Sequence, residues 1–410
     1  MPIPASSDAP ETDYHMPECS ADQKETSFRV LYLVNFLAPD LLAVCRRWKE
    51  LLGNLAILVS VPMEGNRNWR PDHEGLNVVT QRTWTITKSG KHPSGYSDVS
   101  FIHIPLDTYQ QIRRIRPDVI VSAELGVRSL MASLYRRLNS RCRLVIAVST
   151  SEHIEQSREG ALRRFQRRRL LRNADLVTYN GDSCRQYVMK LGVAEGNLYP
   201  WIYAADPTKP FHGPLRRIQS DAHYLSLLTV GQLIERKGVL NAAEQLARWC
   251  SEHPDAILTW TLVGSGPCET SLKNMPFPPN LKIDFWGNCD ADRIRQAYET
   301  HECMLFPTLG DEWGLVTDEA LASGVAVIGS DKAQSCPALI RDGENGFVYD
   351  PLQTDGLANS LNQWFAMSAE QRMQMRIAAR ESMSSRTYET SSDQIATVCR
   401  LLLTRLREEG

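Results

Sequence analysis

Three stretches of the chain combine glycine with charged residues in a pattern that suits phosphate binding. They are VGQLIERKG at 230–238, LVGSGP at 262–267 and DEWGLVTDEALASGVAVIGSD at 311–331. In the third stretch, the backbone N–H groups of Gly314, Leu315 and Val316 lie at the predicted start of a helix, where anions bind well. Lys237 can bring its ammonium group to the same anion, although a lone loop lysine is more often solvated. We therefore predict a phosphate site in this half of the chain.

Glu319 is a second residue with predicted chemistry. If the helix begins near Gly314, Glu319 shares one face with the apolar Leu315 and Ala322. A carboxylate among apolar neighbours needs a hydrogen-bond partner. Glu319 is therefore a candidate for a binding role, and the alternative is a solvated glutamate on the helix surface.

Apolar runs that alternate with helix-length segments surround these residues and predict two α/β domains. Such continuous runs are typical of parallel sheets that helices cover on both faces. N-terminal strands are expected at 28–34, 55–61, 118–123, 144–149 and 175–180, with a helix at 43–52. C-terminal strands are expected at 224–230, 258–264, 281–287, 303–307 and 326–331, with helices after 351.

The segment between the two series contains three prolines and a glycine over 203–217, which predicts a linker. We expect a disordered acidic tail at 1–27, an N-terminal Rossmann-like domain at 28–205, the linker at 206–217, a C-terminal Rossmann-like domain at 218–385 and a C-terminal helix in 386–410. Two doubly wound domains would face each other across a cleft, and ligands bind at the carboxyl ends of such strands.

The composition excludes several classes of protein. The 410 residues carry a formal charge of −2, which argues against a dedicated nucleic-acid binder. The ten cysteines form no CxxC pair and no cluster with zinc-ligand spacing, so we expect free thiols and no metal site. Because no apolar stretch approaches 18 residues, we expect a protein that does not span a membrane.

In this order and at this spacing, the three glycine-containing stretches resemble glycosyltransferase family 4, whose members have the GT-B fold. The resemblance is strong over 224–350 and extends to the N-terminal half only in general layout. It implies a retaining transferase that moves a hexosyl unit from a UDP- or GDP-sugar to an acceptor hydroxyl. The nucleotide-diphosphate sugar would be a co-substrate, and neither a metal nor another cofactor is implied.

The resemblance also assigns roles to individual residues. Glu319 matches the second acid of the family's E-x7-E motif, which binds the ribose hydroxyls, and Asp311 stands at the first acid, which holds the transferred sugar. Gln232 stands where members often have an arginine, so Arg236 or the N-terminal domain supplies the missing charge, or the diphosphate binds more weakly. The expected donor-binding residues are Gly231, Gln232, Arg236, Lys237, Gly264, Gly314, Leu315, Val316 and Glu319.

Glu152 and His153 are the candidates from the N-terminal half. They follow the strand expected at 144–149, where the family often has a residue that contacts the acceptor or the sugar. Capping of the next helix explains them equally well, and Glu124 has a weaker claim at the same edge. The candidate catalytic residues are Lys237, Asp311, Glu319, Glu152 and His153.

An arginine-rich run at 157–172 predicts a cationic helix. It could contact an anionic membrane, or it could be an ordinary solvated helix face. The arginines expected to make the contact are Arg163, Arg164, Arg167, Arg168 and Arg169.

For the whole protein, we expect a cytoplasmic enzyme of polysaccharide or glycolipid biosynthesis, peripheral to a membrane, with a lipid-linked or glycan acceptor. One alternative is a glycosyltransferase for a small-molecule natural product. Another is a nucleotide-sugar-binding protein that has lost turnover, for which the departures at Gln232 and Asp311 are the only support.

Overall fold

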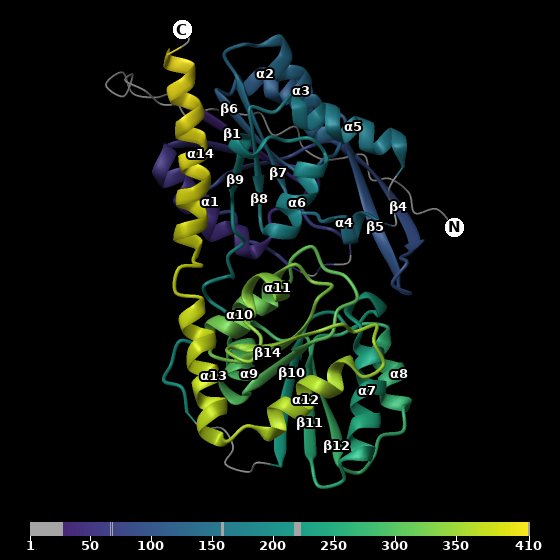
Figure 1. Ribbon diagram of the computed structural model, residues 1–410. Helices are drawn as coiled ribbons and strands as arrows, with labels where there is room; N and C mark the ends of the chain where they lie inside the picture. Colours follow the sequence, from purple (N-terminus) through teal and green to yellow (C-terminus); the bar gives the residue numbers. More distant parts are fainter. Residues whose placement is uncertain (1–27, 66, 68, 157–159, 217–222, 409–410) are drawn as a thin grey trace.

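The computed structural model describes residues 28–408 except 66, 68, 157–159 and 217–222. The tail expected at 1–27 lies outside the described residues. Two domains, each built on a parallel sheet, lie one above the other (Figure 1). The predicted pair of Rossmann-like domains facing across a cleft is confirmed.

The N-terminal domain contains a seven-stranded sheet in the order β3-β2-β1-β6-β7-β8-β9, with every neighbouring pair parallel. Its register sets Val30 of β1 opposite Leu55 of β2 and Val119 of β6. The strands are β1 (Arg29–Val34), β2 (Asn54–Val59), β3 (Asn77–Thr80), β6 (Val119–Ala123), β7 (Arg143–Val148), β8 (Leu176–Tyr179) and β9 (Leu198–Pro200). The central strands are apolar on both faces because helices cover both.

Two helix layers sandwich this sheet. On one face, Trp48 of α1 (Pro39–Leu52) and Ile395 of α14 (Tyr388–Glu408) share a core with the sheet. On the other face, the core includes residues of four helices, among them Ile112, Tyr135 and Leu170. These helices are α2 (Thr108–Ile115), α3 (Val127–Leu138), α5 (Ala161–Arg172) and α6 (Asp182–Lys190), and the short α4 (Glu152–Glu155) precedes α5.

The C-terminal domain contains a six-stranded parallel sheet in the order β12-β11-β10-β13-β14-β15. Its strands are β10 (Tyr224–Val230), β11 (Ile257–Val263), β12 (Leu281–Gly287), β13 (Cys303–Phe306), β14 (Ala326–Ser330) and β15 (Gly346–Tyr349). One face packs against α7 (Val239–Glu252), α8 (Cys268–Asn274) and α12 (Gly356–Ala366). The other packs against α9 (Ala291–Thr300), α10 (Leu315–Ala322), α11 (Ser335–Leu339) and α13 (Ala369–Ser382).

Both sheets are doubly wound, and each has a point where the strand order reverses. In the N-terminal sheet this switch point lies between β1 and β6, and in the C-terminal sheet between β10 and β13. The loops that leave two such strands turn to opposite faces of the sheet, so a crevice opens at their carboxyl ends. The two switch points provide the places to look for bound ligands.

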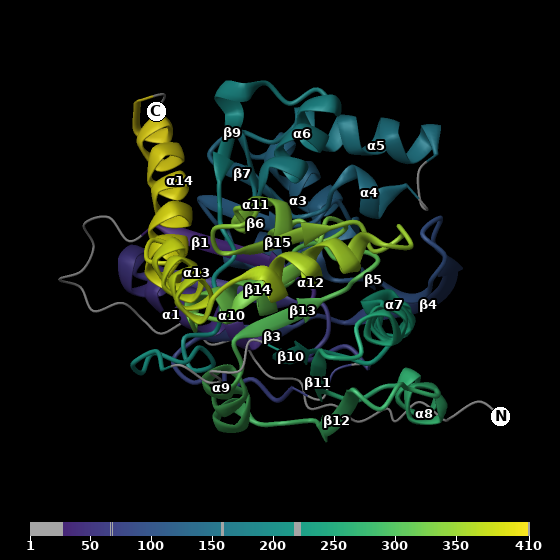
Figure 2. The ribbon, with the colours of Figure 1, turned by 60° about the horizontal axis from the view of Figure 1, so that its bottom comes forward.

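A protruding hairpin is an element that the sequence pattern did not predict. Its strands, β4 (Thr83–Lys91) and β5 (Ser97–Pro105), pair antiparallel outside both parallel sheets. Because the hairpin is largely exposed, its strands lack the apolar runs that mark the buried strands. Figure 2 shows it at the edge of the molecule, beside helix α7 of the other domain. Strands β3, β9 and β15 were also missed, because each contains only two or three consecutive apolar residues.

The chain crosses between the domains twice, and the two crossings are hydrogen-bonded to each other. The first crossing begins at 201–203, and the second joins α13 to α14. Nε1 of Trp201 donates to Oγ of Ser391 at 3.1 Å, and Arg386 donates to the carbonyl of Tyr203 at 3.1 Å. Helix α14 then runs along α1, so the C-terminal helix packs on the N-terminal domain (Figure 1).

Candidate active site

Glycines at the C-terminal switch point allow two loops to touch. After β10 and β11 the loops pass so closely that a Cβ on Gly264 would lie 1.9 Å from the carbonyl oxygen of Gly231. Gly264 also has φ +135°, a conformation that side chains disfavour. Packing alone therefore demands a glycine at this position, and Gly231 and Gly264 form the floor of the crevice.

Two cations converge on one carboxylate at the mouth of this crevice. Lys237, the last residue of a short 3-10 helix (Glu235–Lys237) after β10, forms an ion pair with Oδ2 of Asp311, which follows β13. Nη1 of Arg236 lies 3.2 Å from Oδ1 of the same carboxylate and also donates to the carbonyl of Gly310 at 2.9 Å. Ion pairs thus join the loop after β10 to the loop after β13.

The pair of cations controls the ionisation of Asp311. Burial alone would raise the pKa of this carboxyl, but the adjacent Lys237 and Arg236 outweigh burial and hold the pKa below its ordinary value. Asp311 is therefore ionised at neutral pH and occupies a place where an anion is strongly favoured.

A third cation, Arg67, comes from the other domain. It lies in the loop after β2, and burial, together with the nearby charge of Arg236, lowers its pKa, whereas Glu64 and Asp311 raise it. Arg67 thus lies within electrostatic reach of the Arg236 and Asp311 pair. The sequence pattern does not single out Arg67, although it follows a predicted strand in a loop that also contains Trp69, whose ring it covers at 4.7 Å. Its position makes it an N-terminal-domain charge of the kind expected to offset Gln232.

The N-terminus of α10 adds backbone donors beside these cations. The N-cap is Gly314, with φ +100°, where a Cβ would lie 2.5 Å from the ring of Phe306. No side-chain hydrogen bond caps α10. The first turn, with Leu315 and Val316, has its positive dipole end in the crevice and can bind an anion.

Glu319 is buried on α10 with only 3% of its surface exposed. Its Oε2 accepts a hydrogen bond from the Tyr298 hydroxyl at 2.9 Å, and its Oε1 lies 3.1 Å from Nζ of Lys209 in the linker. The structure therefore excludes a solvated surface glutamate. Each oxygen retains a lone pair that a ligand hydroxyl could use.

Glu152 and His153 lie at the domain interface but differ in their contacts. Nε2 of His153 is 3.2 Å from the carbonyl oxygen of Leu309, which lies two residues before Asp311 in the same loop. Glu152 is half-exposed and forms an ion pair with Lys190 on α6. Both line a hollow of about 180 Å³, with Asp331 and Lys332 on its other wall. His153 thus contacts the C-terminal domain directly, whereas Glu152 is exposed and pairs with Lys190 of its own domain.

The hairpin tip reaches the same interface. The ring of His92 stacks on Tyr96 at 4.7 Å and lies 5.1 Å from the ring of His153. The Tyr96 hydroxyl lies where a Cβ on Gly310 would be 2.5 Å away, and the backbone N–H of Ser97 donates to Glu235 at 2.9 Å. The hairpin tip therefore lies beside the loop after β10 that carries Arg236 and Lys237, which we call the cation loop.

A polar network occupies the N-terminal switch point. Nδ2 of Asn35, after β1, donates to Glu124 at 2.8 Å, and the buried Arg128 donates to Asn35 and to Ser60. Glu124, after β6, has φ +68°, which is uncommon for a residue other than glycine. Its side chain is 51% exposed and available to a ligand in the cleft. The sequence favours Glu152 over Glu124 as a site residue. In the structure, however, Asn35 and Arg128 hold Glu124 at the switch point, whereas Glu152 has no such contacts there.

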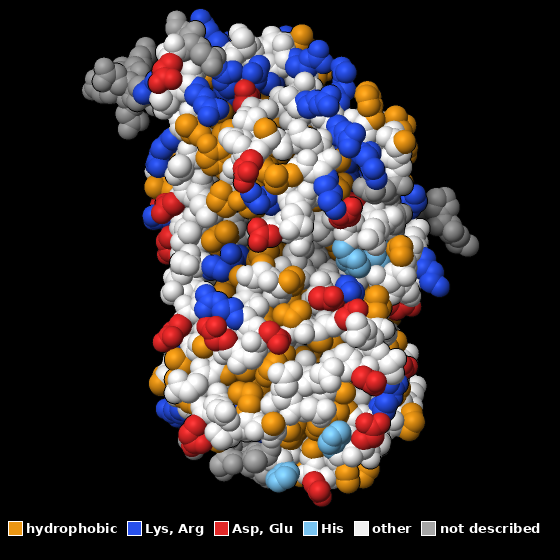
Figure 3. Space-filling model, viewed as in Figure 1, with side chains coloured by type: hydrophobic (Ala, Val, Ile, Leu, Met, Phe, Trp, Pro, Cys, Tyr) orange, Lys and Arg blue, Asp and Glu red, His pale blue; other side chains and the backbone are white. Residues whose placement is uncertain are grey.

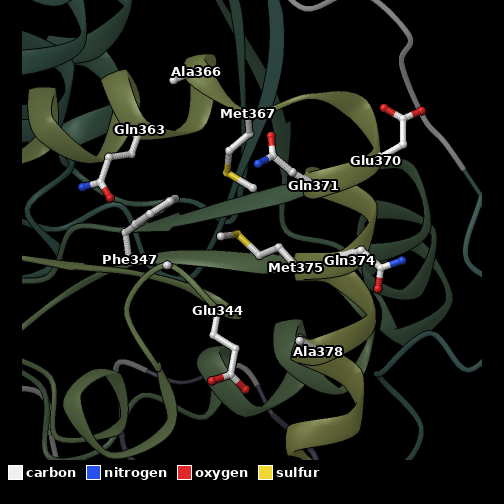
Figure 4. A pocket seen from close by; sticks show the side chains of 11 residues that line it. Glu344, Phe347, Gln363, Ala366, Met367, Glu370, Gln371, Gln374, Met375 and Ala378 are labelled. Atoms are coloured by element: carbon white, nitrogen blue, oxygen red, sulfur yellow. The ribbon is translucent and has the colours of Figure 1, made fainter.

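A larger hollow, of about 690 Å³, lies away from these residues (Figure 4). Phe347, Met367 and Met375 line it between β15, α12 and α13. None of the predicted site residues borders it, and its charged lining residues are the acids Glu344 and Glu370, with no lysine or arginine to bind a phosphate.

The interpretation of five membrane-facing arginines needs one correction. Arg167 is buried, because it is bound to Glu155 at 2.8 Å and to the Tyr187 hydroxyl. Arg163 also pairs with Glu155, at 3.2 Å, while remaining half-exposed. Arg164, Arg168 and Arg169 are exposed on α5. The prediction was wrong for Arg167, because arginine spacing alone does not reveal a buried acid.

Two features were sought in the part of the chain that the structure describes. No helix there is both long and apolar enough to cross a bilayer. No group of three or more histidine, cysteine, aspartate or glutamate side chains there is arranged to hold a metal ion. Independence from metal remains a prediction.

Comparison with protein families matches residues 216–382 to a family described as glycosyl transferases group 1. The match covers the second domain, with the cation loop, the motif from Asp311 to Glu319 and α13. The family match and the fold together support the group 1, GT-B type of the predicted resemblance.

Curated relatives are distant and share only part of their length with this chain. Sulfoquinovosyl transferase SQD2 of Arabidopsis thaliana is 27% identical over 121 residues, which is 29% of this chain and 23% of that protein. D-inositol 3-phosphate glycosyltransferase of Corynebacterium diphtheriae is 22% identical over 254 residues, 58% of this chain and 59% of that protein. For several relatives the matched part is about a quarter of their length.

Solved structures match nearly the whole chain. Sucrose-phosphate synthase from Thermosynechococcus elongatus superposes with a TM-score of 0.67 at 15% identity, covering 92% of this chain and 100% of the other. HepE of Anabaena in complex with UDP gives a TM-score of 0.66 at 15% identity, covering 91% and 100%. At this identity the likeness establishes the fold, and the chain has the GT-B fold.

Proposed function

We propose that this protein is a retaining glycosyltransferase that moves a hexosyl unit from a UDP- or GDP-sugar to an acceptor hydroxyl. The observation that carries the proposal is the convergence of Arg236 and Lys237 on Asp311, in the loops that lead to the N-terminus of α10. The two cations carry one positive charge more than the carboxylate of Asp311 neutralises, and they suit the phosphates of a nucleotide sugar. Structures of similar fold hold UDP or UDP-glucose, which supports this class of donor.

Donor binding would rearrange the ion pairs rather than add to them. A diphosphate that enters the crevice competes with Asp311 for Lys237 and Arg236. Once released, the carboxylate of Asp311 would accept hydrogen bonds from hydroxyls of the transferred sugar, and Glu319 would accept them from the ribose. Because Asp311 is one methylene shorter than glutamate, we expect it to favour a sugar held close to the loop after β13.

In the proposed reaction, the bond from the anomeric carbon to the phosphate oxygen breaks while the acceptor oxygen bonds to the same face of that carbon. The acceptor's proton passes to the leaving phosphate oxygen, so no side chain needs to act as nucleophile. The protein then contributes position and charge: Lys237, Arg236 and the α10 dipole stabilise the negative charge that develops on the diphosphate. Neither a metal nor another cofactor has a step in this scheme.

The acceptor would bind on the N-terminal side of the cleft. Glu124, held by Asn35, and His153, held against the donor loop, are the groups that we propose to contact it. We propose a lipid-linked or glycan acceptor of polysaccharide or glycolipid biosynthesis, used in the cytoplasm at the face of a membrane. A small-molecule acceptor is the alternative within the same reaction.

One observation favours a second candidate, a nucleotide-sugar-binding protein without turnover. Gln232 brings no charge, and the carboxylates of Asp311 and Glu319 are already paired with lysines. In such a protein, Lys209 and Lys237 would stay on their carboxylates when the nucleotide binds.

Thermal-shift titrations with nucleoside diphosphates and nucleotide sugars test donor binding, because a ligand of the folded state raises the unfolding temperature. Donor hydrolysis and transfer to an acceptor panel, with and without EDTA, then test the reaction. Glu319→Ala should lower transfer by at least ~100-fold, whereas Lys273→Ala, on exposed α8, should not. Nucleotide binding with neither hydrolysis nor transfer would favour the binding protein.

A further inference from the structure

Three neighbouring helices of the N-terminal domain contain arginine and no acidic residue. Helix α2 has two arginines, α3 has three and α5 has six, while none of the three sequences includes aspartate or glutamate. All three lie in the layer that covers one face of the N-terminal sheet. Their outer surface is therefore strongly positive although the whole chain is close to neutral.

The inner sides of these helices use some of the arginines for packing. Arg128 is buried in the network at the switch point, Arg136 binds Asp175 at 2.8 Å, and Arg167 binds Glu155. The outward arginines are a separate set on the exposed surface. They are Arg113 and Arg114 of α2, Arg137 of α3, and Arg164, Arg168, Arg169 and Arg172 of α5.

Large apolar side chains lie among the outward arginines. On α3, Leu130, Leu134 and Leu138 are 41%, 44% and 65% exposed, and their spacing of four residues places them on one side of the helix. On α5, Leu162 and Phe165 are 70% and 62% exposed. We call these five residues and the outward arginines the arginine–leucine surface.

The arginine–leucine surface is continuous. Helix α3 contacts both α2 and α5, so its leucines lie between the two other helices. Figure 3 shows Lys and Arg side chains gathered over the upper domain, with hydrophobic side chains between them, whereas acidic and basic side chains are mixed below. The surface lies on the domain that faces the acceptor.

We propose that the arginine–leucine surface binds the face of an anionic lipid bilayer. Its arginines match the phosphates of anionic headgroups, because positive side chains are attracted to the negative surface potential of such a bilayer. Its leucines and Phe165 match the acyl region just beneath, where exposed apolar side chains leave water. Neither component suffices alone, since arginines fit any polyanion and leucines fit any apolar partner.

The apolar component decides between a bilayer and a nucleic acid. Phosphate contacts from arginine would serve both, but a duplex offers nothing to bury three aligned leucines and Phe165. The outer side of a helix layer is also broad rather than grooved, as a bilayer requires. The proposal does not depend on the transferase reaction, because vesicle binding is measured without donor or acceptor.

Flotation of the full chain with vesicles tests the proposal. We expect binding to vesicles that contain 30% phosphatidylglycerol, weak binding to pure phosphatidylcholine, and loss of binding at high salt. The R137Q/R168Q/R169Q/R172Q variant should lower partitioning by at least ~10-fold. The matched control R248Q/R341Q/R405Q/R407Q removes the same charge from exposed arginines elsewhere and should bind like wild type.

A second variant, L134Q/L138Q/L162Q/F165Q, tests the apolar component at constant charge. It should also lower partitioning by at least ~10-fold, while thermal shifts with nucleoside diphosphates stay those of wild type and show that the protein is folded. Unchanged binding of this variant, together with competition by RNA, would overturn the proposal in favour of a polyanion site. Equal loss in the control variant, or no vesicle binding at low salt, would also overturn it.

Discussion

The two switch points of this protein have the same topology and opposite chemistry. At the C-terminal one, Lys237 and Arg236 surround a single acid, Asp311, and Arg67 adds to them from across the cleft. At the N-terminal one, the only arginine of the network, Arg128, is buried, and Glu124 is the charged group that faces the cleft.

This difference follows from what each half would have to recognise. A diphosphate makes the same demand whatever sugar it carries: several positive groups and a helix N-terminus in a small crevice. An acceptor makes demands that vary with its hydroxyls, so no fixed set of residue types marks its site. The fold therefore provides two equivalent crevices, and the charge at each one indicates which substrate it suits.

The most direct way to break the comparison is to remove the charge that defines the C-terminal switch point. Lys237→Ala should reduce transfer by at least ~100-fold, because it removes a positive group from the developing charge on the leaving diphosphate. Steady-state donor turnover measures this effect, with Lys273→Ala as the matched lysine variant on the same domain. A rate near that of wild type would remove Lys237 from the site.

The ion pairs of Asp311 at the C-terminal switch point should contribute to the free energy of unfolding, and this contribution should depend on pH. Because its pKa is lowered from 3.8 to about 2, Asp311 contributes about 2 kcal/mol that is present above pH 4 and is lost as the pH falls toward 2. Chemical denaturation of wild type and Asp311→Asn should therefore differ most at pH 5 to 7 and converge in acid. A constant difference across this range would show that the ion pairs are not the cause.

Arg67 tests whether the donor site includes both domains. Arg67→Ala should weaken the binding of a nucleoside diphosphate by ~10-fold, a loss expected for one charge-assisted contact that is partly exposed. The neighbouring Arg70→Ala, which removes an exposed arginine from the same loop, provides the control. Isothermal titration with UDP and GDP separates the two. Equal affinities for the two variants would confine the donor site to the C-terminal domain.

Glu124 should show the smallest effect, and one limited to the acceptor. Glu124→Gln keeps the shape of the side chain and removes its charge, so we expect the KM for the acceptor to rise by ~5-fold to ~10-fold. Donor affinity should not change, because Arg128 and Asn35 hold this residue on the opposite side of the cleft. An equal change in the KM for the donor would show that Glu124 also affects donor binding, so that the two switch points would not be separate sites.

The sequence predicted the buried half of the fold well, and the reason is physical. Strands such as β1 and β10 match their expected bounds to within one residue because a strand covered on both faces is a nearly continuous apolar run. The hairpin β4–β5 and the four-residue β15 lack such a run and were missed. The sequence pattern also placed Lys237 and Asp311 at the same edge of the C-terminal sheet, where the two side chains form an ion pair.

The partners of those residues could not be predicted. Lys209 pairs with Glu319 from 110 positions away, and Arg67 of the other domain lies within electrostatic range of Asp311. Such contacts depend on how the domains close, which no local pattern records. Likewise, Arg167 turned inward because Glu155 lies beneath it. Local spacing identifies which residues can do chemistry, and tertiary packing decides which are available.

The paired crossings between the domains have a mechanical consequence. Two adjacent connections are joined by the hydrogen bonds of Trp201 to Ser391 and of Arg386 to Tyr203. A rotation of one domain against the other that keeps these two bonds must therefore have its axis close to the crossings. Arg386 also lies 3.3 Å from Asp318 on α10 and covers Trp313 at 5.1 Å. Arg386 thus connects the crossing between the domains to α10, the helix whose N-terminus lies at the C-terminal switch point. A movement of one domain against the other would therefore act directly on this helix.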